Sequence, residues 1–280
     1  MIEATLARLD NMLILDRTND LSEPDVLYPF ALDELLCKRT GEGGPAICHL
    51  WRHPRAFVMG MRDSRLPGAA SAARWLEAAG YAVAVRNSGG AAVPLDLGVV
   101  NLSLILPHAK PNASHFRDDF EHMYGLIAQA LAGSGRTVDK GEVKGAFCPG
   151  DYDLSINAFK FCGIAQRRQL RAFAVQAFVI AGGSGKDRAS LVREFYTRAA
   201  EGADPASYPQ VTEDSTASLN ELAGIGPDAP AVFAEAVKRT IRQRQTEQGM
   251  AAAAASLQLP APDEVREMAK SMRERYSISG

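Results

Sequence analysis

The sequence predicts an α/β fold with a mixed, largely antiparallel sheet flanked by helices. Apolar runs of strand length are separated by short turns, as at 152–156 and 159–165, where Asn157-Ala158 makes the turn. Strands joined in this way run antiparallel, whereas a doubly wound sheet needs a helix between successive strands. The chain has 280 residues and is 46% hydrophobic, enough for one large domain or two.

The expected elements follow one another along the chain. Apolar runs bounded by turn signals predict strands at 46–51, 56–60, 81–86, 99–106, 152–156, 159–165 and 172–180. Helical spacing predicts helices at 30–36, 71–79, 118–131 and 188–200. We expect Ser71 to cap the second of these helices and Gly80 to stop it.

Composition changes at about residue 205. Proline and glycine punctuate the chain up to Pro230, and the remainder has the composition of helices. We therefore divide the chain into an α/β body, 1–204, and a mainly helical C-terminal extension, 205–280, packed on it.

Bulk properties exclude several classes of protein. The net charge of −2 does not favour a nucleic-acid binder. The N-terminus lacks the pattern of a secretory signal, and no apolar run reaches the roughly 18 residues of a spanning helix, so we expect a cytoplasmic protein. The four cysteines lack metal-finger and redox spacing, and no metal site is expected. The glycines at 182–185 do not match a nucleotide-binding loop, because Asp187 replaces the required Ser or Thr.

The first candidate site is the loop Arg86-Asn-Ser88-Gly89-Gly90-Ala between two apolar strands. Two glycines let backbone amides approach a ligand, and an arginine beside them can hold an anionic or carbonyl oxygen. The polar residues Asp96-Leu-Gly98 and Asn101-Leu-Ser103 follow closely, and this density favours a site over an ordinary turn.

The second candidate is Cys148, in a loop just before a predicted strand. An ordinary thiol has a pKa of about 8.5 and needs a nearby cation or base to act as a nucleophile. Lys160, at the start of the returning hairpin strand, is positioned to supply it, although a solvated lysine is the simpler interpretation. Arg167 and its neighbours at 166–168 fit a surface basic cluster, and His53 is the histidine we place near a pocket.

These motifs together resemble the biotin/lipoate protein ligase and octanoyltransferase superfamily. The resemblance is greatest to its octanoyl-[glycine cleavage H protein]:protein N-octanoyltransferases. It is carried by FALDELLC at 30–37, MGMRDSRLP at 59–67, VRNSGGAAVPLDLGVVNLSL at 85–104, FCPGDYDLSINAFKFCGIAQRR at 147–168, AVQAFVI at 174–180 and LVREFY at 191–196. It implies a sheet flanked by helices, related to the cores of class II aminoacyl-tRNA synthetases.

The resemblance also implies roles for particular residues. Cys148 would carry an acyl thioester, and Lys160 would lower the pKa of that thiol and contact the acyl carbonyl. The family's acyl-site loop matches Arg86, Ser88, Gly89 and Gly90, and His53 matches a histidine in a similar turn.

The activity implied is transfer of an octanoyl or lipoyl group in lipoate biosynthesis. The group would pass from a lysine of the glycine cleavage H protein to lysines of lipoyl domains in 2-oxoacid dehydrogenases. No cofactor is expected, because one amide is exchanged for another. The strands at 81–85 and 99–106 are expected to wall a slot for the chain, in which each buried methylene contributes about 0.8 kcal/mol.

Three other functions stay open from the sequence. The donor could be octanoyl carrier protein, with the H protein as acceptor. The chain could be an ATP-dependent lipoate ligase, although those enzymes carry RxSGGGxVxHD, and this chain has Ala91 and Leu95 in place of the third glycine and the histidine. It could also be a noncatalytic acyl-binding protein.

Overall fold

The computed structural model describes residues 9–108 and 116–278. The strands in these residues are β1 (Leu13–Arg17), β2 (Ile47–Trp51), β3 (Arg55–Met59), β4 (Ala82–Val85), β5 (Val93–Asp96), β6 (Val99–Pro107), β7 (Asp139–Lys140), β8 (Leu154–Ile156), β9 (Phe159–Arg168) and β10 (Ala172–Ile180). The helices are α2 (Leu27–Gly41), α3 (Ala69–Ala78), α4 (Phe116–Ala130), α5 (Gly185–Ala199), α6 (Leu219–Ala223), α7 (Ala229–Arg242), α8 (Glu247–Ser256) and α9 (Pro262–Arg275). All predicted elements are present with slightly shifted ends, and β1, β5 and β7 add to them.

The described strands form two sheets. The larger has seven strands in the order β1-β2-β6-β10-β9-β8-β7, and only the β1–β2 pair in it is parallel. The smaller has the order β4-β3-β5, with one parallel and one antiparallel pair. The predicted mixed, largely antiparallel sheet is thus confirmed. The β8–β9 hairpin turns at Asn157 and Ala158, whose φ values of 52° and 65° suit a tight two-residue turn.

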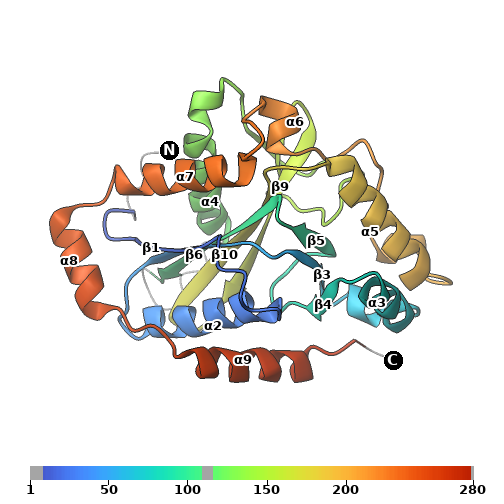
Figure 1. Cartoon of the computed structure of the whole chain (residues 1–280), viewed down its shortest axis with the longest axis horizontal. Helices are drawn as coiled ribbons and strands as arrows, with labels where there is room; N and C mark the ends of the chain where they lie inside the picture. The colour runs from blue at the N-terminus through green and yellow to red at the C-terminus, as the bar shows by residue number, and fades with distance from the viewer. Residues whose placement is uncertain (1–8, 109–115, 279–280) are drawn as a thin grey trace.

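Helices cover both faces of the large sheet (Figure 1). Helix α2 lies on one face, and α4 and α7 lie on the other. Side chains alternate between the two faces along each strand, so that Ala174 and Phe178 of β10 join one apolar cluster while Val175 and Val179 join the other. The small sheet stands beside α2, between it and helices α3 and α5.

One predicted boundary is wrong. Helix α3 begins at Ala69, two residues before Ser71, and its N-cap is Gly68 without a side-chain cap. The backbone N–H of Gly68 donates to the carbonyl of Ala199 at 2.8 Å, and a Cβ on Gly68 would lie 2.3 Å from the carbonyl oxygen of Arg198. This close contact with the end of α5 sets the start of the helix. Gly80, with φ of 84°, follows its C-terminus as predicted.

The C-terminal extension shares its core with the body. Helix α9 packs along the outer side of α2 (Figure 1), and its side chains Val265, Ala269 and Met272 are buried in the cluster that also contains α2. Arg39 of α2 donates to the carboxylate of Glu264 at 2.6 Å. No helix within 9–108 or 116–278 has the length and apolar composition needed to cross a membrane.

Shortening a buried side chain of α9 tests this shared core. We expect Val265→Ala to lower the free energy of unfolding by about 2 kcal/mol, because Val265 is 1% exposed and loses two buried methyl groups. The matched control is Val232→Ala in α7, where the valine is 46% exposed and the change should stay within about 0.5 kcal/mol. Denaturant unfolding measures both, and equal effects would contradict a core role for α9.

Candidate active site

Cys148 is set apart from the other cysteines by its backbone and its exposure. It lies in the loop between β7 and β8 with φ of 48°, a left-handed conformation that is uncommon for residues other than glycine. Its side chain is 8% exposed, whereas Cys37, Cys48 and Cys162 are fully buried. Burial raises the pKa of each of those three thiols, that of Cys37 to about 12. Cys148 is therefore the candidate nucleophile.

Two hydrogen-bond donors of the Arg86–Ala91 loop contact the sulfur of Cys148. The backbone N–H of Ala91 donates to Sγ at 3.2 Å, and Nη2 of Arg86 donates to it at 3.4 Å. The guanidinium is fixed by the carbonyl oxygens of Gly89 and Ala91, at 3.0 and 2.6 Å. A cation and an amide held in this way stabilise a thiolate.

Gly90 makes this approach possible. Its φ is 94°, and a Cβ at this position would lie 2.8 Å from Sγ of Cys148 and 2.6 Å from Nη2 of Arg86. The loop that the sequence singled out and the predicted nucleophile, about sixty residues apart in the chain, thus form one site.

Lys160 binds the backbone of the loop that carries Cys148. It is fully buried, and its Nζ donates to the carbonyl oxygens of Phe147 and Cys148 at 2.8 and 2.5 Å. It also forms an ion pair with Asp153 Oδ1 at 2.8 Å. These three oxygens are its polar contacts among the described residues, so Lys160 holds the backbone of Cys148, while Arg86 and Ala91 contact the thiol itself.

Asp153 is the acidic partner that sequence reasoning missed. It is 1% exposed, and burial raises the pKa of its carboxyl group to about 6, against the opposing effect of Lys160. The sequence could have pointed to Asp153 as a site residue, because it lies in the segment 147–168 that carries the family resemblance.

The C-terminal extension contacts the same lysine. The N–H of Lys160 donates to the carbonyl of Ser215 at 2.9 Å, and the carbonyl of Lys160 accepts from the N–H of Ala217 at 3.0 Å.

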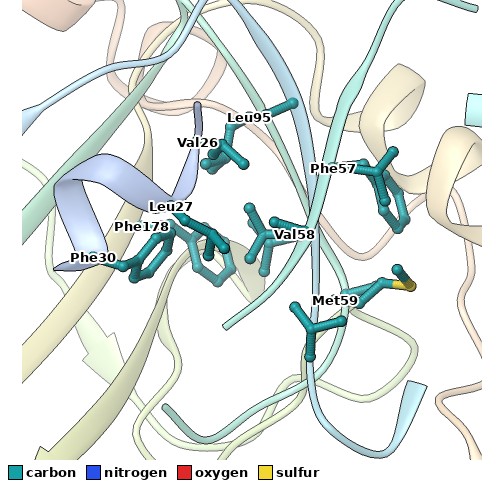
Figure 2. Packing of buried hydrophobic residues seen from close by; sticks show 14 of the residues in the cluster. Val26, Leu27, Phe30, Phe57, Val58, Met59, Leu95 and Phe178 are labelled. Atoms are coloured by element: carbon teal, nitrogen blue, oxygen red, sulfur yellow. The ribbon is translucent and has the colours of Figure 1, made fainter. Parts of the chain in front are cut away.

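A narrow cavity of about 50 Å³ opens beside Cys148. It is lined by Phe30, Trp51, Val58, Arg86, Ser88, Val93, Leu95, Asn101, Ser103, Cys148, Gly163, Ile164, Ala165, Gln176, Ala177 and Phe178. Figure 2 shows Phe30 and Phe178 side by side with Val58 directed toward them, while Phe57 lies on the other side of β3. The cavity thus lies between the two sheets under α2.

The prediction that the strands at 81–85 and 99–106 line the cavity is partly wrong. Strand β4 does not contribute to its lining, which on the small sheet comes from Val58 of β3 and from Val93 and Leu95 of β5. Strand β6 contributes the polar side chains Asn101 and Ser103, since its leucines at 102 and 104 point to the opposite face.

Other predicted residues have different places. His53 is absent from the lining of the cavity: its Nε2 is 3.2 Å from the carbonyl of Pro24, and its Nδ1 accepts from the N–H of Arg55 at 3.1 Å. This turn lies at the far end of β3 from Gly60, so the strand carries His53 away from Cys148. Ser88 lines the cavity.

The predicted basic cluster at 166–168 is neutralised by carboxylates. Arg167 donates to both carboxylate oxygens of Glu34, each at 2.8 Å, and Arg168 pairs with Asp119. Asp96, in the first candidate site, accepts two hydrogen bonds from Arg188 of α5 at 2.6 and 2.9 Å. These ion pairs link helices to strands, and none of their side chains contacts the sulfur of Cys148. Across 9–108 and 116–278, no three His, Cys, Asp or Glu side chains come together as metal ligands.

Comparisons with known proteins place this geometry in a family. A model described as "Lipoyl protein ligase A/B catalytic domain" matches residues 25–243. The octanoyl-[GcvH]:protein N-octanoyltransferase of Geobacillus kaustophilus (strain HTA426) is 42% identical over 221 residues, covering 78% of each chain. The lipoyl-[GcvH]:protein N-lipoyltransferase of Listeria monocytogenes serovar 1/2a (strain ATCC BAA-679 / EGD-e) is 36% identical over 223 residues, covering 79% of this chain and 80% of that protein.

A solved structure has the same fold. A bi-partite lipoate protein ligase from Thermoplasma acidophilum, studied with its E2 lipoyl domain, has a TM-score of 0.60 and 16% identity, covering 95% of this chain and 92% of its own.

Filling the space at Gly90 tests the contacts of the thiol. We expect Gly90→Ala to slow alkylation of Cys148 by iodoacetamide at neutral pH at least about tenfold, because the added methyl group displaces two hydrogen-bond donors from the reacting sulfur. Gly80→Ala is the matched control: its φ of 84° imposes similar backbone strain, but nothing lies within 4 Å of the added atom. Alkylation of Gly90→Ala at the rate of the control would contradict this role.

The raised pKa of Asp153 predicts a pH dependence of stability. A carboxyl group with a folded pKa of about 6 and an ordinary pKa of 3.8 favours folding below pH 4, and this contribution is lost as the pH rises through 6. Between pH 4 and 6 it should lower the free energy of unfolding by no more than about 3 kcal/mol. Asp153→Asn should therefore flatten this part of the pH profile, whereas the exposed control Asp151→Asn should not. Superimposable profiles for wild type and Asp153→Asn would refute the assignment.

Proposed function

We propose, because this chain belongs to the lipoyl protein ligase A/B catalytic domain family, that it moves an octanoyl group between protein lysines as a thioester on Cys148. The chain is a protein N-octanoyltransferase of lipoate biosynthesis, like its relatives at about 40% identity. The observation that carries the covalent step is a cysteine sulfur with two hydrogen-bond donors, placed at the wall of a mostly apolar cavity.

The first half of the reaction forms the thioester. The thiolate of Cys148 attacks the carbonyl carbon of octanoyl-lysine on the glycine cleavage H protein. The carbon–nitrogen bond then breaks, and the lysine leaves as an amine after taking up a proton. Arg86 and the backbone of its loop lie beside the sulfur, where they can stabilise the negative charge that develops on the carbonyl oxygen.

The second half restores the thiolate. The neutral amine of an acceptor lysine attacks the thioester, the carbon–sulfur bond breaks, and the nitrogen loses a proton. One amide bond is lost and one is formed, so the exchange needs no ATP. Acceptors of this chemistry are lysines of lipoyl domains in 2-oxoacid dehydrogenases, and their placement by the protein surface would supply much of the rate.

Lys160 acts in this scheme mainly as a positioning residue. Its ammonium group binds the carbonyl oxygens of Phe147 and Cys148, and this holds the nucleophile in its left-handed conformation. The ion pair with Asp153 offsets the cost of burying the charge.

A lipoyl group is the second candidate cargo. The Listeria monocytogenes relative is named as a lipoyltransferase and covers a similar share of this chain. The same thiol and the same exchange of amides would serve either acyl group, so comparison of octanoylated with lipoylated H protein decides between them.

Intact mass after mixing with octanoylated H protein, without ATP, tests the thioester. We expect a gain of one octanoyl group that hydroxylamine removes, and no gain by Cys148→Ala. Cys37→Ala, which removes a fully buried thiol, is the control and should acylate normally. Acylation of Cys148→Ala would exclude the covalent role of this residue, and a requirement for ATP would exclude amide exchange.

A further inference from the structure

The apolar face of the large sheet that looks toward α2 is interrupted by polar side chains. Along β10 this face carries Ala172, Ala174, Phe178 and Ile180, but Gln176 breaks the series. Asn101 and Ser103 break it on β6, and His49 breaks it on β2. His49, Asn101 and Ser103 are buried, and Gln176 is partly buried. Polar side chains in such places cost stability unless they are hydrogen-bonded.

The interruption forms two cross-strand rows. Gly163, Phe178, Asn101 and Trp51 face one another across β9, β10, β6 and β2. Ala165, Gln176, Ser103 and His49 form the next row on the same face, about 7 Å further along the strands. All of these residues except His49 line the cavity beside Cys148.

The first row lies at the Cys148 end of the cavity. The ring of Phe178 is 5.8 Å from that of Phe147, the neighbour of Cys148, and 5.5 Å from Nζ of Lys160. The second row lies further from Cys148 along the strands. The row after it, with Ile105 and Ala174, does not line the cavity. The second row is therefore the far limit of the space on this face.

A buried carboxyl group holds the second row in place. Asp33 of α2 is 2% exposed, and its Oδ2 accepts from Nε2 of Gln176 at 2.8 Å and from Oγ of Ser103. Its Oδ1 lies 2.8 Å from Nδ1 of His49. We call Asp33, His49, Ser103 and Gln176 the Asp33 cluster. Oε1 of Gln176 has no hydrogen-bond partner among the described residues, although the other end of its amide is fixed.

We propose that the Asp33 cluster is the end wall that sets the acyl-chain length accepted at Cys148. This rests on the proposed function for the identity of the cargo. A chain that ends before the cluster lies against Phe30, Val58, Val93 and Leu95, and it leaves the cluster intact. A longer chain has to displace Gln176 or Ser103 from a buried carboxyl group and leave it short of donors.

The selectivity thus arises from polarity as well as from volume. An apolar end wall could yield by rotation of its side chains, whereas the cluster is bonded from helix α2 and three strands at once. Extra methylenes in an apolar pocket change selectivity about 10- to 200-fold, and an unpaired buried polar group changes it further.

The test is the binding of hexanoate, octanoate, decanoate and dodecanoate to the full chain, measured by calorimetry. We expect wild type to bind octanoate at least about tenfold more tightly than decanoate. Gln176→Met, which keeps a long flexible side chain and removes the amide, should reduce this ratio to about threefold or less. Gln129→Met is the matched control, because Gln129 is exposed on α4.

A second variant and a second readout keep the outcomes distinct. Ser103→Ala removes another donor from Asp33 with little change in volume, and it should shift the ratio in the same direction if Gln176→Met fails to fold. Affinity that rises through dodecanoate in wild type, no binding of any acid, or an unchanged ratio in both variants would overturn the proposal. Binding of a free acid requires no thioester. A shifted ratio of octanoate to decanoate affinity without acylation of Cys148 would therefore contradict the proposed function but still support the Asp33 cluster as the end wall.

Discussion

The buried ammonium group of Lys160 joins the parts of the active site to one another. It binds the carbonyl oxygens of Phe147 and Cys148 and the carboxylate of Asp153. The backbone of Lys160 is hydrogen-bonded to the segment 215–217 of the extension. A charged amine without water must find such partners, because an unpaired buried charge is very costly. The loop that carries the thiol is therefore held where these oxygens are needed.

The thiol is completed from the other side by the Arg86–Ala91 loop. This loop follows β4 of the small sheet, whereas Cys148 precedes β8 of the large sheet. The site thus lies at the junction of the two sheets, and α2 contributes Phe30 to the lining of the cavity between them. Anything that moves one sheet relative to the other would alter both the donors to the sulfur and the shape of the acyl cavity. The extension, through α9 and the segment beside Lys160, braces this junction.

Local sequence signals predicted those features that depend on neighbouring residues. The hairpin at Asn157-Ala158, the stop at Gly80 and the alternation of β10 follow from backbone preferences and side-chain periodicity. The prediction that Ser71 caps α3 is wrong, because the helix begins at Ala69, where Gly68 contacts the end of α5. His53 was placed at a pocket because its turn precedes a strand, but the strand runs away from that turn toward the site.

The sequence by itself determined the chemistry available: a cysteine in a loop, a glycine-rich segment beginning with arginine, and a lysine on the next hairpin. These are short segments whose residue types and spacing restrict what they can do. Tertiary structure alone decided that Arg86 and Ala91 contact the sulfur while Lys160 holds the backbone. It also assembled the Asp33 cluster, whose members come from α2, β2, β6 and β10. The physical reason is that strand register and helix packing place residues far apart in sequence within hydrogen-bond distance, and no local pattern encodes which partner each polar group finds.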